Sequence, residues 1–392
     1  MRQAACAEAA IEILDLIISA ARIKGAPADR LIAEYFRSRR YAGSKDRRYI
    51  RELVYQSIRS CGPIPKDGRS AMLRLAEKDP SILSLFDASK HGPAFIDPQE
   101  KIAEGGIASN WIVEELTKSG ISTAEMEVLL ERAPLDLRVN SLKADRNSLV
   151  LPTNGENLTS RQGVRVPNGT KVELWLAYQN GEIEIQDCGS QLACDAFAAL
   201  PGEIVIDLCA GAGGKSLAIA ADMQNEGKII ACDTNKSRLD KLPVRASRAG
   251  AEIIETRLLN ANFELEGLED LKGKANAILI DAPCSGSGTW RRNPEARWRL
   301  DQNEIARLTL LQDRLIDIAV SLLSPNGRLG FVTCSLFDQE GTHRIEAALL
   351  RHKCLKTLEV NLPIGRKRGS GVRLSPSKDN TDGFFISMFE VS

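Results

Sequence analysis

The 392-residue sequence lacks an excess of charge of either sign, any cysteine pair spaced as CxxC, and a long uncharged hydrophobic run near its start. Lys plus Arg and Asp plus Glu each number 52, so any affinity for nucleic acid must come from local patches. Nine cysteines without regular spacing fit neither a zinc site nor a disulfide framework, and we expect no metal. Charged residues interrupt the N-terminal apolar stretch, which excludes a signal peptide or a membrane span there. We therefore expect a cytoplasmic protein that does not bind a membrane.

A hydrophobic content of 43% with 27% charged residues is typical of a soluble globular protein, and the length allows two or three domains. Residues 1–60 are predicted to be helical, because apolar residues recur at helical spacing from Ile11 to Ala21. A basic segment, residues 37–51, interrupts this helical part. Its composition fits either a solvated surface or a phosphate-binding patch with interleaved tyrosines; its basic residues are Arg37, Arg39, Arg40, Lys45, Arg47, Arg48 and Arg51.

The middle of the chain changes from helical to β-rich. Residues 61–109 are rich in Pro, Gly and Asp, which indicates a domain boundary or a reduced helical region. A helical pair is expected at 110–132. Alternating apolar and polar residues then predict strands of a small subdomain at Leu135–Asn140, Lys171–Leu176 and Glu182–Ile185.

From about residue 187, strands alternate with helices, a pattern that predicts a parallel sheet with helices on both faces. The predicted strands are Glu203–Leu208, Lys228–Asp233, Glu252–Thr256, Asn276–Ile280, Arg328–Thr333 and Gly383–Glu390. One helix is predicted to begin at Gly214, and three more are predicted at 235–249, 301–323 and 338–352.

One loop in this part carries the features of a site. Asp281-Ala-Pro-Cys-Ser-Gly-Ser-Gly288 follows the apolar run 277–280, so a buried strand delivers an acid and a thiol into a glycine-rich loop. Ligands collect at the carboxyl ends of parallel strands. Asp281 and Cys284 are therefore candidate functional residues.

The first turn, Val205-Ile-Asp-Leu-Cys-Ala-Gly-Ala-Gly-Gly-Lys-Ser216, fits three ligand classes. A P-loop for nucleoside triphosphates needs glycine where Cys209 stands, and a dinucleotide-binding turn needs glycine at Ser216. The third class is an S-adenosylmethionine-dependent methyltransferase, whose cofactor ribose is held by an acid ending the next strand. Asp233 lies at the expected distance, although an acid there could also cap the helix 235–249.

A second cysteine is predicted to lie near the first. Cys334 ends the strand that follows the one carrying Cys284, and both thiols should reach the same sheet edge. Each cysteine alone is more often a small buried hydrophobe, but the pair beside a cofactor turn favours chemistry. A thiolate that adds to carbon 6 of cytosine activates carbon 5 for methylation, and an acid such as Asp281, protonated or sharing a proton with the ring, would stabilise the developing charge.

Several ordered motifs together resemble the RsmB/Nop/Sun family of RNA (cytosine-5)-methyltransferases. They are Gln186-Asp-Cys-Gly-Ser-Gln191, the turn at 207–216, Asp281-Ala-Pro-Cys284, Arg292-Asn-Pro-Glu-Ala-Arg-Trp298, Thr333-Cys-Ser335, Arg373 and Asp382-Gly-Phe-Phe385; weaker resemblance begins near residue 105.

This resemblance implies Cys334 as the nucleophile and Cys284 as the thiol that helps to release the product. DNA cytosine-5 methyltransferases use the Pro-Cys cysteine as nucleophile, which would instead favour Cys284. The resemblance also places Asp281 between cofactor and base, and Lys215 near the reacting groups. The implied cofactor-binding residues are Cys209, Ala210, Gly211, Ala212, Gly213, Gly214, Lys215, Asp233 and Asp281.

The sequence departs from the family pattern at two places. Ala212 replaces the proline that is usual in the turn. The acid normally found near the adenine is absent, so Asn260 or Asn262 is expected in its place, and we choose Asn260.

The N-terminal residues, with Ser44-Lys-Asp-Arg-Arg48, resemble the NusB-type RNA-binding domain of the RsmB branch, which implies ribosomal RNA as substrate, with transfer RNA or a non-catalytic assembly role as alternatives. We expect a monomer with a helical domain at 1–104, an α+β subdomain at 105–186 and a Rossmann-like domain at 187–392. The expected RNA-binding residues are Arg39, Arg40, Arg47, Arg48, Arg291, Arg292 and Arg297.

Overall fold

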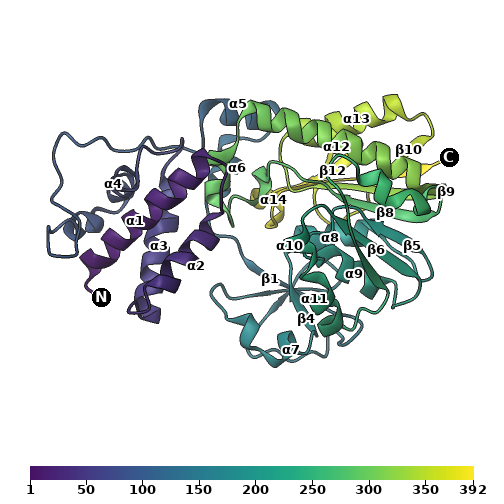
Figure 1. Cartoon of the computed structure of the whole chain (residues 1–392), viewed down its shortest axis with the longest axis horizontal. Helices are drawn as coiled ribbons and strands as arrows, with labels where there is room; N and C mark the ends of the chain where they lie inside the picture. The colour runs from purple at the N-terminus through teal and green to yellow at the C-terminus, as the bar shows by residue number, and fades with distance from the viewer. The chain divides into compact units, whose positions relative to one another are not determined.

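The computed structural model describes residues 1–392, which divide into two compact units. Unit 1 comprises Met1–Arg132 and Thr289–Asp301, and unit 2 comprises Ala133–Gly288 and Gln302–Ser392. Residues 105–132 therefore belong to the helical unit 1. The β-rich region that follows them belongs to unit 2, together with the large sheet. Figure 1 shows the helices and strands of each unit.

Unit 1 is helical, as the apolar spacing predicted. Ile13, Leu14, Ile17 and Ile18 form one fully buried stripe of its first helix. The side chain of Asp67 caps the fourth helix by accepting a hydrogen bond from the backbone N–H of Ser70 at 2.8 Å. The helices are α1 (Gln3–Arg22), α2 (Ala28–Ser38), α3 (Ser44–Ser60), α4 (Gly68–Lys78), η1 (Pro80–Leu85), α5 (Asn110–Lys118) and α6 (Thr123–Val128).

The segment 289–301 returns to unit 1 from the middle of unit 2's sequence. It contains the short helix η5 (Pro294–Arg299), and Trp298 joins the hydrophobic core built by α1 to α4. A motif predicted for the catalytic region is thus part of the helical core.

Unit 2 contains a small antiparallel sheet in the order β2-β3-β1-β4, formed by β1 (Leu135–Val139), β2 (Glu156–Asn157), β3 (Gly163–Val166) and β4 (Ile183–Ile185). The expected strand at 171–176 is wrong, because these residues form η2 (Val172–Leu174) and begin α7 (Leu176–Gln179). Val172 is buried whereas Leu174 and Leu176 are 69% and 73% exposed, so the alternation does not mark a sheet face.

The large sheet of unit 2 has nine strands in the order β11-β12-β13-β9-β8-β5-β6-β7, with β10 paired to β13. The strands β5 to β9 pair in parallel, and β13 runs antiparallel beside β9. Their bounds are β5 (Ile204–Asp207), β6 (Lys228–Asp233), β7 (Ile254–Leu258), β8 (Ala275–Asp281), β9 (Leu323–Thr333), β10 (Leu355–Leu358), β11 (Arg366–Arg368), β12 (Gly371–Leu374) and β13 (Phe384–Val391).

Helices cover both faces of this sheet, as the alternating pattern predicted (Figure 1). Ala277 and Leu279 of β8 join the core with α8 (Cys188–Phe197), α9 (Gly214–Asp222) and α11 (Leu242–Ala249). Ile278 and Ile280 join the opposite core with α12 (Gln302–Leu322) and α13 (Thr342–Arg351). The uncharged strand is therefore buried on both faces.

The expected single helix at 235–249 is divided into α10 (Lys236–Leu239) and α11. Pro243 lies in the first turn of α11, where its missing N–H costs nothing but prevents continuation from α10. The remaining short helices are η3 (Glu264–Leu271), η4 (Ser287–Thr289), η6 (Asp338–Glu340) and α14 (Pro376–Asp379). None of the helices is long and apolar enough to cross a membrane.

Candidate functional site

The site lies at the carboxyl ends of the central parallel strands. The strand order reverses at β5, with β6 on one side and β8 on the other, and ligands bind at such a switch point. The strand ends bring Asp207, Asp233 and Asp281 to this edge, and Cys334 follows β9 directly. The sheet thus assembles residues that are up to 127 positions apart in the chain, from Asp207 to Cys334.

Two positions in the turn after β5 require glycine. Gly211 and Gly213 have φ values of 58° and 84°, the left-handed region that favours glycine. A Cβ on Gly213 would lie 2.1 Å from a methyl carbon of Leu242, and one on Gly211 would lie 2.5 Å from the Arg238 guanidinium. The backbone of the turn is therefore held in one conformation by its surroundings.

The helix that follows this turn presents donors suited to an anionic ligand. Gly213 caps α9 without a side chain, so no side-chain acceptor uses the first N–H groups of the helix. The space beside the Gly214 Cα is open to at least 4 Å. Free N–H groups at a helix start suit the carboxylate of an amino-acid moiety such as that of S-adenosylmethionine, and these residues fit the predicted cofactor.

Asp233 ends β6 and supports the turn through its carboxylate. Its Oδ2 accepts the Gly211 N–H at 2.8 Å, and its Oδ1 accepts the Asn235 N–H at 2.6 Å. Asn235, not Asp233, is the N-cap of α10, because its side chain accepts from the Arg238 N–H. Asp233 therefore braces the cofactor turn in addition to lying where a ribose acid is expected.

The two asparagines after β7 differ in their surroundings. Asn262 Oδ1 accepts a hydrogen bond from Arg314 at 2.8 Å, so this oxygen is already engaged within the protein. Asn260 is exposed at the loop after β7, and the neighbouring Leu259 N–H donates to the Asp233 carbonyl. Asn260 is therefore next to a residue that bonds the backbone of Asp233, and its role at the cofactor stays a prediction.

Lys215 and Asp281 form an ion pair at the centre of this edge, with Nζ and Oδ2 2.6 Å apart. Burial alone would lower the pKa of Lys215, but the charge of Asp281 and its hydrogen bond raise that pKa above its ordinary value. The Lys215 ammonium also lies 5.7 Å from the centre of the Phe384 ring. This ion pair places the side chain of Asp281 against Lys215 of the cofactor turn.

The two predicted thiols meet. Cys284 Sγ and Cys334 Sγ lie 3.4 Å apart, and both side chains are partly accessible. The hydrogen bond with Cys334, together with burial, raises the pKa of Cys284 well above its usual value. Cys284 therefore keeps its proton at neutral pH, and either sulfur can be the donor in this contact.

Three buried polar residues around the site were not singled out from the sequence. Asp207 is fully buried, accepts the Ser216 hydroxyl at 2.6 Å, and has its pKa raised by burial to about 7. Glu340 and Gln312 are fully buried beside the thiol loop and hydrogen-bond to each other at 3.1 Å. An acid ending a buried apolar strand was a usable signal for Asp207, but Glu340 and Gln312 lie on helical segments with no motif that indicates burial.

Comparison with known proteins decides the family. Residues 196–390 match the profile described as 16S rRNA methyltransferase RsmB/F. The chain is 31% identical over 308 residues to the probable ribosomal RNA small subunit methyltransferase B of Bacillus subtilis, covering 75% of this chain and 68% of that protein. The corresponding probable enzyme of Synechocystis is 32% identical over 317 residues, covering 76% and 70%. The chain belongs to the RsmB/F methyltransferase family.

A solved structure is similar in fold. The methyltransferase homologue from Pyrococcus horikoshii is 26% identical and superposes with a TM-score of 0.61 over 72% of this chain and 100% of its own. S-adenosylmethionine is accordingly the cofactor of this RsmB/F-type protein, which confirms the prediction from the turn and sets aside the P-loop and dinucleotide alternatives.

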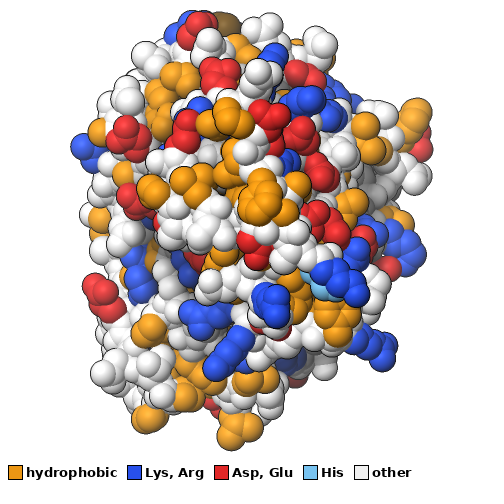
Figure 2. All heavy atoms as spheres, turned by 90° about the vertical axis from the view of Figure 1, so that its left-hand side faces the viewer, with side chains coloured by type: hydrophobic (Ala, Val, Ile, Leu, Met, Phe, Trp, Pro, Cys, Tyr) orange, Lys and Arg blue, Asp and Glu red, His pale blue; other side chains and the backbone are white.

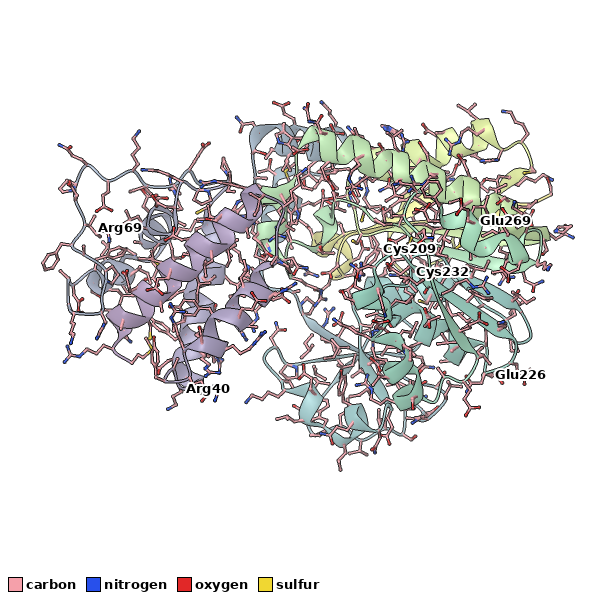
Figure 3. The ribbon with its side chains drawn as sticks, viewed as in Figure 1. Arg40, Arg69, Cys209, Glu226, Cys232 and Glu269 are labelled. Atoms are coloured by element: carbon pink, nitrogen blue, oxygen red, sulfur yellow. The ribbon has the colours of Figure 1, made fainter.

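The basic segment 37–51 of this RsmB/F-type chain contains two kinds of arginine. Arg40 and Arg48 are exposed, and Figure 3 shows Arg40 at the periphery of the helical unit. Arg39 lies over the Tyr35 ring and pairs with Glu12, while Arg47 donates to the Ala42 carbonyl at 2.8 Å. Lys and Arg side chains gather in the lower half of the face in Figure 2.

The arginines of the 292–298 motif are less accessible than expected. Arg297 is 1% exposed and donates to the carbonyls of Ile58 and Cys61 at 2.7 and 2.6 Å. Arg291 is 4% exposed, and only Arg292 is partly accessible. Burial corrects the expectation that Arg291 and Arg297 face RNA: the guanidinium of Arg297 is enclosed by protein carbonyls, and the side chain of Arg291 is almost entirely covered.

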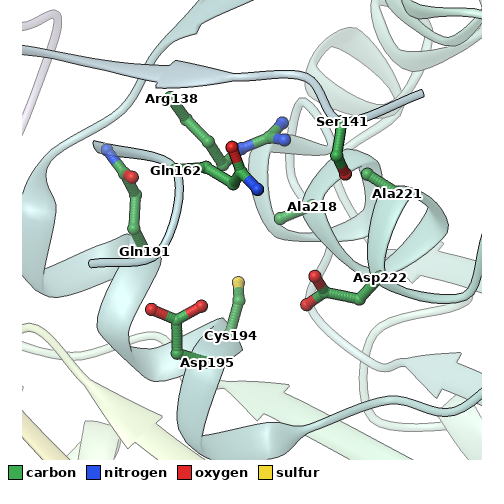
Figure 4. A pocket seen from close by; sticks show the side chains of 9 residues that line it. All are labelled: Arg138, Ser141, Gln162, Gln191, Cys194, Asp195, Ala218, Ala221 and Asp222. Carbon is green, nitrogen blue, oxygen red and sulfur yellow. The ribbon is translucent and has the colours of Figure 1, made fainter. Parts of the chain in front are cut away.

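A small cavity behind the cofactor helix is lined by Arg138, Cys194 and Asp222 among others (Figure 4). Its volume of about 10 Å³ holds no more than a single water molecule. Arg138 reaches it from β1 and donates to Gln186 at 2.7 Å, within the motif 186–191. The motif 186–191 therefore connects β1 of the small sheet to the start of α8.

Proposed function

We propose that this protein methylates carbon 5 of a cytidine in small-subunit ribosomal RNA, in the cytoplasm and with S-adenosylmethionine as the methyl donor. The observation that carries the proposal is the pair of thiols 3.4 Å apart at the ends of β8 and β9. A family methyltransferase that acted on oxygen or on an exocyclic nitrogen would need no thiol. Ring carbon 5 needs one, since it is too weak a nucleophile without prior addition at carbon 6.

Cys334 is the nucleophile in this mechanism. Its thiolate adds to carbon 6, a carbon–sulfur bond forms, and the ring electrons move toward carbon 5. The bound cofactor supplies the electrophilic methyl group for carbon 5. The hydrogen bond to Cys334 and burial raise the pKa of Cys284, which makes Cys284 the poorer nucleophile of the pair and suits it to the later step.

Cys284 acts after methyl transfer. Once Cys334 is a thioether, the hydrogen bond that raised the pKa of Cys284 is weakened, and Cys284 loses its proton more easily. It then takes the proton from carbon 5, the ring double bond reforms, and Cys334 leaves as a thiolate. One pair of sulfurs therefore serves both bond formation and bond breaking.

Lys215 and Asp281 orient the cytosine. Lys215 holds the Asp281 carboxylate at 2.6 Å, beside the cofactor turn. As the thiolate adds to carbon 6, the ring nitrogen takes up a proton that Lys215 supplies through Asp281, and the Asp281 carboxylate then accepts hydrogen bonds from that N–H and from the exocyclic amino group. This neutralises the negative charge that addition places on the ring, and the proton returns by the same route when the ring double bond reforms.

Ribosomal RNA is supported as the substrate by the curated relatives, both of which are named as probable small-subunit ribosomal RNA methyltransferases. Bisulfite sequencing of total RNA from cells with and without the gene tests this directly. We expect one 5-methylcytidine of small-subunit RNA to disappear in the deletion. A site lost only from transfer RNA would contradict the substrate assignment.

The covalent mechanism is tested with purified variants and substrate RNA. Cys284→Ala should trap a protein–RNA adduct that survives denaturing electrophoresis, whereas Cys334→Ala should form none and lose at least about 10³-fold in methyl transfer. Cys354→Ala, a partly buried thiol after α13, is the matched control and should behave as wild type. An adduct formed by Cys334→Ala but not by Cys284→Ala would reverse the roles.

A further inference from the structure

A buried carboxylate lies behind both thiol loops. Glu340, in the short helix η6, is 0% exposed and lies six residues after Cys334. Its carboxylate accepts the Ser285 N–H at 2.9 and 3.2 Å, the Ser285 hydroxyl, and the Gln312 amide at 3.1 Å. The residue that follows Cys284 is thus fixed through both its backbone and its side chain.

The backbone of Glu340 contacts the other thiol segment. The backbone carbonyl of Glu340 accepts the Thr333 hydroxyl at 3.2 Å, immediately before Cys334. Ser335, immediately after Cys334, hydrogen-bonds through its hydroxyl to those of Ser285 and Ser287 at 3.2 and 3.1 Å. Gln312 also donates to the Pro283 carbonyl at 2.9 Å, so the residues on both sides of each thiol are connected.

A purely structural role does not require an acid at this position. No Lys, Arg or His forms an ion pair with Glu340, and burial raises the pKa of its carboxyl. Burying a carboxylate without a cation costs several kcal/mol, which an amide or an apolar side chain would avoid. What the carboxylate provides is two oxygens that accept hydrogen bonds from three donors at once, which an amide with its single oxygen cannot match.

We propose that Glu340 is a positioning residue that sets the distance and orientation of Cys284 relative to Cys334. It touches neither RNA nor cofactor in this role and acts through Ser285. The step it serves, removal of the carbon 5 proton by Cys284, rests on the function proposed above. The geometry of the two sulfurs does not depend on that function, and a separate experiment measures it.

The first experiment measures sulfur geometry without RNA. Phenylarsine oxide condenses with two neighbouring thiols, forming two arsenic–sulfur bonds and releasing one water, and it holds poorly to a single thiol. Wild type should retain the arsenical and Cys284→Ala should not. Glu340→Gln should release it about tenfold faster than wild type, because one amide oxygen cannot hold the three donors.

The second experiment measures turnover with substrate RNA. Glu340→Gln should lower kcat about tenfold with KM unchanged, and the protein–RNA adduct should accumulate because its breakdown is slowed more than its formation. A structural defect would instead lower the amount of adduct. Glu346→Gln, an exposed acid on α13, is the matched control for both experiments and should equal wild type.

The outcomes separate this inference from the proposed function. If wild type does not methylate cytidine but Glu340→Gln still loses the arsenical faster, the function fails and the positioning role stands. If Glu340→Gln matches wild type in arsenical release and adduct level, the positioning role is overturned. Should Glu340→Gln not fold, Ser285→Ala removes the hydroxyl contacts to Glu340, Ser287 and Ser335 but keeps the backbone N–H contact to Glu340, and it must show the same two changes, about threefold in size. Their absence there also overturns the inference.

Discussion

Buried charged groups in the two units meet different kinds of partner. Unit 1 buries the guanidinium of Arg297 against backbone carbonyls of α3 and the residues that follow it. Unit 2 buries carboxyl groups, Asp207 and Glu340, beneath the strand ends that carry the site. Burial lowers the pKa of Arg297 to about 10 and raises that of Asp207 to about 7.

Because of this difference, the two buried groups respond differently to pH. The buried arginine keeps its charge at any physiological pH, so unit 1 gains a permanent donor for carbonyls that helices leave unpaired. Asp207 changes its protonation near neutral pH, so the stability of unit 2 must vary with pH. Three changes test the contrast.

The largest effect is expected from Arg297→Ala. The substitution leaves the Ile58 and Cys61 carbonyls buried without this donor and opens a cavity, at a cost of about 4 kcal/mol of unfolding free energy. Urea unfolding followed by tryptophan fluorescence measures it, because Trp111, Trp290 and Trp298 all lie in unit 1.

Arg307→Ala on α12 is the control for this change. Its guanidinium pairs only with Glu304 at the surface, so the loss should stay below about 0.5 kcal/mol. Weakened RNA binding by Arg297→Ala with unchanged stability would restore Arg297 to the RNA-binding set and remove the contrast between the units.

The pH dependence of unit 2 should change in Asp207→Asn. The folded state raises the pKa of Asp207 from 3.8 to about 7, so it binds the proton more tightly than the unfolded chain. The resulting stability is present in full below pH 4 and is lost as pH rises through about 7. Between pH 5 and 7.5 wild type should lose roughly 2–3 kcal/mol from this group, which Asp207→Asn should not lose.

Urea unfolding followed by far-ultraviolet circular dichroism at the two pH values measures this difference. Asp240→Asn, an exposed acid at the end of α10, is the matched control and should retain the wild-type slope. A wild-type slope in Asp207→Asn would show that the buried acid is not the titrating group.

The smallest effect is expected from the exposed arginines of unit 1. Arg40→Glu combined with Arg48→Glu should leave unfolding free energy within about 0.5 kcal/mol of wild type, because neither side chain is buried. RNA affinity should fall about tenfold, and the dependence of its logarithm on the logarithm of salt should become shallower by roughly 2.

Arg30→Glu on α2 reverses an exposed charge outside the segment 37–51 and provides the comparison. Equal RNA affinity for all three proteins would return the segment to an ordinary solvated surface. The residues Arg39 and Arg47 are less suitable for this test, because their contacts with Glu12 and Ala42 would mix stability with binding.

Most strands of the large sheet could be predicted because their residues are apolar on both faces, as at Ala277–Ile280. The site edge followed from the same pattern, since every acid or thiol at a parallel strand end must meet there. The segment 171–176 could not be predicted, because its alternation reflects two leucines left at the surface rather than a buried face. The motif 292–298 was recognised, but its place in the helical core was not.

The sequence by itself determined which reactive groups stand at the site edge: two cysteines and an acid at strand ends, and a glycine turn for the cofactor, because each depends on residue type and on local order. Only the tertiary structure decided which polar groups are buried and what they contact. Arg297 and Arg48 are the same residue type, yet one holds carbonyls and the other faces solvent. Glu340 fixes the thiol loops through its bonds to Ser285 and Gln312, which lie 55 and 28 positions away in the chain, and no local pattern encodes such contacts.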